Sequence, residues 1–93
     1  MFMNDEKFIE RAGFFQQYFS GKPQEYVESE FAEGLNLSIL WVEALNCFVR
    51  KDGRFLELKK ELEKAAVENS DRSVRLIDLK MQVRYWIKST DKG

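Results

Sequence analysis

The sequence predicts an all-α protein, a compact bundle of four to five helices around a central apolar helix at about residues 36–50. Apolar residues recur at spacings of three and four over most of the chain, which is the period of amphipathic helices. Most glycines and the single proline fall between these periodic segments. A chain of 93 residues, 44% of them hydrophobic and 14% aromatic, suffices for one core and is too short for two. We therefore expect a single domain over residues 1–93.

The N-terminal segment has the pattern of a helix that Asn4 or Asp5 caps and that ends near Ser20. Its apolar residues, spaced by four, three and four positions, are Phe8, Ala12, Phe15 and Phe19. We expect this face to pack against the core.

A short, acidic second helix is expected at about residues 23–33. Pro23 suits a first helical turn, and Gly34 can supply the left-handed residue that closes the helix. Its acidic residues are Glu25, Glu28, Glu30 and Glu33. Oxygen-ligand metal sites normally draw on several elements, so we interpret this group as an acidic surface and not as a metal site.

The third expected helix, from about residue 36 or 38 to Arg50, is apolar almost all round and should form the centre of the bundle. The second and third helices together have the proportions of a helix-turn-helix motif with its turn at Gly34. The four preceding glutamates, which would face phosphates, disfavour this alternative.

Lys51-Asp52-Gly53 predicts a turn, followed by an amphipathic helix at about residues 54–68. Asp-Gly between apolar flanks is also a hairpin signal, so a β-hairpin across residues 47–58 stays open as an alternative. The Leu-, Glu- and Lys-rich continuation favours the helix.

The last helix, expected from Asp71 or Ser73 to about Ser89, carries two opposed apolar arcs. The first arc, which we expect in the core, consists of Leu76, Leu79, Val83, Trp86 and Ile87. The second arc, termed the α-helical stripe below, consists of Val74, Ile77, Met81 and Tyr85. This stripe either packs inside the bundle or lies exposed for a partner, and the sequence supports both readings.

Lys80, Arg84 and Lys88 recur every four residues and should form a basic row between the two arcs. Such a row can contact nucleic-acid phosphates, but cations near a helix C-terminus also have a structural explanation. Charge is uneven along the chain: eight acidic and three basic residues give −5 over residues 1–46, and eight acidic and twelve basic residues give +4 over residues 47–93. The acidic half could imitate a nucleic-acid backbone.

Several kinds of chemistry are missing from the sequence. There is no histidine, the single cysteine Cys47 lies in an apolar segment, and the glycines are never clustered. We therefore expect no catalytic residues, no cofactor and no metal, and we expect Cys47 to act as a small core residue. No signal peptide or membrane span is expected, which predicts a cytoplasmic protein.

The leading functional hypothesis is a non-enzymatic protein-binding module, a small regulator, adaptor or inhibitor of a larger protein or complex. The expected partner-binding residues are Val74, Ile77, Met81, Tyr85, Lys80, Arg84 and Lys88. The partner is another protein or a second copy of the chain, which would make a homodimer. The alternatives are a nucleic-acid-binding regulator that uses the basic last helix and an acidic nucleic-acid mimic that uses the N-terminal half.

Overall fold

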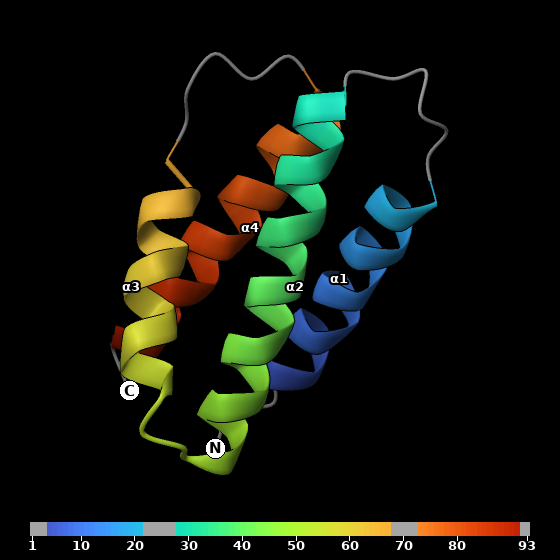
Figure 1. The fold of residues 1–93 in the computed structure, drawn as a ribbon. Helices are drawn as coiled ribbons and strands as arrows, with labels where there is room; N and C mark the ends of the chain where they lie inside the picture. The colour runs from blue at the N-terminus through green and yellow to red at the C-terminus, as the bar shows by residue number, and fades with distance from the viewer. Residues whose placement is uncertain (1–3, 22–27, 68–72, 92–93) are drawn as a thin grey trace.

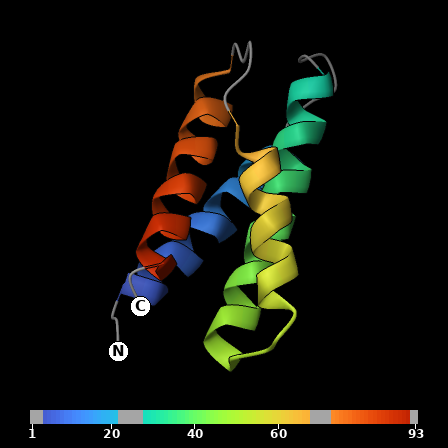
Figure 2. The same ribbon diagram turned by 90° about the vertical axis from the view of Figure 1, so that its left-hand side faces the viewer.

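The computed structural model describes residues 4–21, 28–67 and 73–91. They form four helices, α1 (Asn4–Ser20), α2 (Glu28–Arg50), α3 (Phe55–Ala65) and α4 (Val74–Asp91), so the predicted all-α bundle is confirmed. Successive helices run in opposite directions, with α2 between α1 and α3 and α4 behind α2 (Figure 1). Figure 2 shows α4 as a second layer beside α2 and α3, and α4 packs on both. The predicted central helix is therefore central in space as well.

The core lies where the helical periodicity predicts it. The expected face of α1 is buried throughout, and so is the first arc of α4. The two tryptophans, Trp41 on α2 and Trp86 on α4, are buried with ring centroids 6.5 Å apart. Phe48 and Phe55 meet the Trp86 ring edge-on, which ties the turn between α2 and α3 to α4.

The expected helix end at Gly34 is wrong, because α2 continues through this residue without a break. Gly34 is buried, and a Cβ atom there would lie 2.5 Å from Cε1 of Phe19 on α1. Glycine is required by this close approach of an aromatic ring and not by a helix terminus. The helix-turn-helix alternative needs a turn at Gly34 and is wrong for the same reason. The predicted helix start at Pro23 lies outside the described residues.

The β-hairpin alternative is also wrong, because residues 47–58 form the end of α2, a turn and the start of α3. Lys51 takes the left-handed conformation that closes α2, with φ of 60°, and the Asp52 N–H donates to the Cys47 carbonyl at 2.8 Å. Asp52 Oδ1 then accepts the Arg54 N–H at 3.0 Å. This backbone hydrogen bond, followed by contacts with the Arg54 guanidinium, holds the pKa of Asp52 below its ordinary value.

The membrane prediction can be compared with the helices that the structure describes. Within these parts of the chain, no helix combines the length and the apolar character that crossing a bilayer requires.

Candidate functional site

The α-helical stripe of α4 faces away from the core. Val74 is 78% exposed, Tyr85 is 67% exposed and Met81 is 51% exposed, whereas Ile77 is half-buried. The opposite arc of α4 is buried, so the bundle covers one side of this helix and leaves the other in solvent. Of the two readings that the sequence left open, exposure of the stripe is the one that the structure supports.

A groove runs between α1 and α4 and includes part of the stripe. One section has a volume of about 590 Å³ and is lined by Arg11, Met81, Gln82, Arg84, Tyr85 and Lys88. The next section, of about 430 Å³, is lined by Glu10, Arg11, Phe14, Phe15, Asp78 and Gln82. Because Arg11 and Gln82 line both sections, the two sections are adjacent, and we term them together the α1/α4 groove.

Long side chains bridge this groove at its middle. Arg11 Nη1 donates to Oε1 of Gln82 at 2.6 Å, which links α1 to α4. Gln82 Nε2 donates in turn to Oδ1 of Asp78 at 3.4 Å.

Aromatic contacts join the same two helices at both ends of the groove. The Phe8 and Tyr85 rings lie 6.2 Å apart at one end. At the other, the Arg75 guanidinium lies 5.3 Å from the ring centroids of both Phe14 and Tyr18. Paired side chains thus connect α1 and α4 along the groove, and Met81 and Tyr85 line it from α4.

Lys80 does not lie on an exposed basic row as expected, because it is fully buried. Its Nζ lies 2.7 Å from Oε2 of Glu33 on α2, and it donates to the Val67 carbonyl at 3.2 Å. The Glu33 side chain is 41% exposed, so the ion pair links the interior to the surface. Burial of an ammonium group requires such partners, and Lys80 thereby joins α4 to α2 and to the end of α3.

The other two members of the basic row differ from Lys80. Arg84 is half-buried, and its Nη1 donates to the Ala66 carbonyl at 2.8 Å. Arg84 and Lys80 therefore place two cations on the carbonyls that follow the C-terminus of α3, where positive charge is stabilising. Lys88, one turn further along α4, is exposed. The expected continuous ridge is thus reduced at the surface to Lys88 and the exposed part of Arg84.

The predicted acidic surface is described only in part. Glu25 lies outside the described residues, and the side chains of Glu28 and Glu30 do as well. Glu33 is described, and its carboxylate pairs with Lys80. The structure therefore assigns this one glutamate to a contact within the fold.

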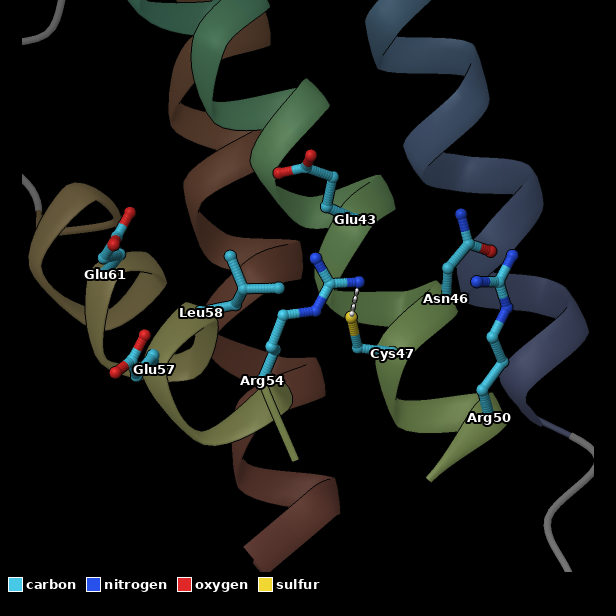
Figure 3. Close-up of a pocket in the computed structure, with 8 residues that line it drawn as sticks. All are labelled: Glu43, Asn46, Cys47, Arg50, Arg54, Glu57, Leu58 and Glu61. Atoms are coloured by element: carbon cyan, nitrogen blue, oxygen red, sulfur yellow. Dashed lines mark hydrogen bonds between the residues drawn. The ribbon is translucent and has the colours of Figure 1, made fainter. Parts of the chain in front are cut away.

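A second, smaller pocket of about 230 Å³ lies between α2 and α3 (Figure 3). It is lined by Glu43, Asn46, Cys47, Arg50, Arg54, Glu57, Leu58 and Glu61. Figure 3 shows the Arg54 guanidinium reaching toward Cys47, whose Sγ accepts a weak hydrogen bond from Nη2 at 3.8 Å. Cys47 is buried, as predicted. Three carboxylates and two guanidinium groups line this pocket, so its charge is mixed, with a formal sum of −1.

Sequence reasoning missed the contribution of α1 to the groove. Arg11 and Phe14 of α1 line the groove opposite Gln82 of α4, but helical periodicity places each residue only on its own helix and does not say which helix lies opposite. A usable signal was present in Phe14, an aromatic residue beside and not on the predicted core face of α1, which is 48% exposed.

Comparisons with known proteins add no relative to this description: no family model matches the chain, and neither a curated protein nor a solved structure is significantly similar to it.

Proposed function

We propose that this chain is a non-enzymatic protein-binding module that engages its partner through the α-helical stripe of α4. The observation that carries the proposal is the exposure of Val74, Met81 and Tyr85 on one face of a single helix. Exposed apolar side chains that recur over several turns of one face are typical of interaction sites, whereas single ones are ordinary. Tyr85 adds a rigid, amphipathic ring of the kind enriched at binding interfaces.

Other exposed apolar residues give a useful comparison. Leu56 on α3 is 65% exposed, and Val49 at the end of α2 is 50% exposed. Neither lines the α1/α4 groove. The stripe, in contrast, is continuous with a groove that a side chain of the partner can enter, which favours it as the binding surface.

The nucleic-acid alternatives have weaker support than the protein-binding proposal. Binding to phosphates requires several exposed cations, and in the expected row Lys80 is buried while Arg84 contacts the Ala66 carbonyl. Mimicry of nucleic acid requires grouped carboxylates, and Glu33 is paired with Lys80.

The proposal is tested by placing charges on the stripe. Val74→Asp combined with Met81→Asp should leave the circular dichroism spectrum and the Tm unchanged, because both side chains are at least half exposed. The same variant should lose the proteins that the wild-type chain captures, and cross-links in the wild-type complex should map to α4. Leu56→Asp, at an apolar position whose exposure lies between those of Val74 and Met81, is the matched control and should capture normally.

Two results would contradict the proposal. Capture of the same proteins in the same amounts by the double variant would show that they bind elsewhere. A large loss of helical content in the double variant would show that the stripe belongs to the core in solution.

A further inference from the structure

We infer that the partner presents to the α1/α4 groove an acidic amphipathic helix, whose apolar face covers Met81 and Tyr85 and whose carboxylates lie beside Lys88. This inference rests on the proposed function and adds the chemistry of the partner to it. Grooves between two helices commonly accept an amphipathic helix through apolar residues spaced by three and four positions.

The charge of the groove is the basis for an acidic partner. Among the residues that the structure describes, the section around Tyr85 is lined by three cationic residues, Arg11, Arg84 and Lys88, and by no carboxylate. Lys88 is exposed, and Arg11 contacts Gln82 and the Phe8 ring. Carboxylates of a partner would therefore meet a complementary potential beside the apolar contact. This potential would speed association and fix the position of the partner along the groove.

The charge also changes along the groove, which gives the bound helix a direction. The section around Phe14 contains Glu10 and Asp78 together with Arg11. Carboxylates of a partner are disfavoured beside these two acids and favoured at the Lys88 end, so the acidic end of the partner helix should lie over Tyr85 and Lys88.

The apolar part of the surface separates this partner from a nucleic acid. Met81 and Tyr85 line the basic section, and Val74 continues the exposed face beyond it. Aliphatic side chains such as Met81 and Val74 offer no stacking surface to bases but do bury the leucine or isoleucine side chains of a helix.

The experiment uses a synthetic helical peptide of about 20 residues, long enough to form a helix when bound. Leucines at i, i+3, i+4 and i+7 form its apolar face, and glutamates are grouped at one end. One control peptide carries lysines in place of the glutamates, and a second keeps the composition but scrambles the leucine positions. Binding to the full chain is measured by NMR titration, with a spin label at the glutamate end of the peptide.

The glutamate peptide should bind roughly ten-fold more tightly than the lysine peptide at low salt, and the difference should shrink as salt rises. Its spin label should broaden the signals of Lys88 and Tyr85 and not those of Phe14. Lys88→Glu should weaken binding of the glutamate peptide and strengthen that of the lysine peptide. Lys60→Glu, an exposed lysine on α3, makes the same change in net charge and should alter neither affinity.

The possible failures can be told apart. Equal binding of the glutamate and lysine peptides, both lost in the Val74→Asp/Met81→Asp variant, would overturn the acidic partner and leave the protein-binding proposal intact. Equal binding of the scrambled peptide, or competition by single-stranded DNA at matched charge, would show that charge alone drives binding and would overturn the inference. Absence of binding by every peptide would overturn the inference. The proposed function would still be tested separately by the capture experiment with the Val74→Asp/Met81→Asp variant. Self-association through the stripe, measured by light scattering, would replace the acidic partner with a second copy.

Discussion

Replacement of Lys80 tests whether this residue stabilises the fold from a buried position on α4. The Lys80 side chain is fully buried, with its ammonium group on the Glu33 carboxylate and the Val67 carbonyl. Lys80→Ala removes the buried methylenes together with the charge, whereas Lys80→Met keeps most of the volume and removes only the charge. Lys88→Met makes the same chemical change at an exposed position of the same helix.

The magnitudes follow from what each substitution removes. Lys80→Ala deletes three buried methylenes, at about 0.8 kcal/mol each, and contacts of an ammonium group that contribute about 1 kcal/mol here. The second figure is small because the Glu33 carboxylate is 41% exposed and is rehydrated when its partner is lost. We expect Lys80→Ala to lower the free energy of unfolding by about 3–4 kcal/mol and Lys80→Met by about 1–2 kcal/mol. Lys88→Met should stay within about 0.5 kcal/mol of the wild type.

The assay is urea and thermal unfolding followed by circular dichroism and by the fluorescence of the buried Trp41 and Trp86. A domain of this size loses about 4–8 °C in Tm per kcal/mol, so Lys80→Ala should lower the Tm by roughly 12–30 °C. Equal stabilities of Lys80→Met and Lys88→Met, both close to the wild type, would refute the reasoning. Lys80 would then contribute no more to stability than the exposed Lys88 does.

Two further predictions concern the fold. Gly34→Ala should destabilise the protein by about 1 kcal/mol, because the gain in helix propensity is smaller than the cost of displacing the Phe19 ring. A Cβ atom at Gly13 meets no atom within 4 Å, so Gly13→Ala should stabilise the protein by about 0.5–1 kcal/mol. Urea unfolding of the two variants checks this, and an equal gain in stability in both would contradict it. The lowered pKa of Asp52 means that its contacts with Arg54 stabilise the protein above the ordinary pKa of 3.8 and that this contribution is lost as the pH falls through the lower folded-state value. Asp52→Ala should therefore be less stable than the wild type at neutral pH and equally stable in acid, and a difference that persists unchanged at the lowest pH would show that it does not come from the carboxylate.

Helical periodicity predicted the core of this protein well because burial of one face is a local property of the sequence. Phe8, Phe15 and Phe19 recur at helical spacing, and the face that they define is buried. The same logic identified the buried arc of α4 and its opposite stripe. For the stripe, however, periodicity could not decide between a second buried face and an exposed one, because that depends on how far α1 lies from α4.

The meaning of a single glycine was not predictable in the same way. Glycine is common both at helix ends and at close approaches between helices, and the acidic segment before Gly34 resembled a short helix of its own. Only the position of the Phe19 ring, which comes from another helix, identifies the second role. The expected helix boundary at Gly34 was wrong because the glycine is required by a contact with another helix and not by the local backbone.

The roles of the basic residues of α4 also depend on tertiary contacts that the sequence does not show. Lys80, Arg84 and Lys88 share one edge of the helix, but the first two donate to the carbonyls of Val67 and Ala66, which follow the C-terminus of α3 at Ala65. Two of the three charges therefore contribute to the end of α3, where they complement the helix dipole. The positive charge that the proposed partner would meet comes from Lys88 together with Arg11, a residue of a different helix, and it borders an apolar stripe. A short basic rim beside an apolar surface suits an acidic amphipathic helix better than a nucleic-acid backbone, which requires cations along a much longer path.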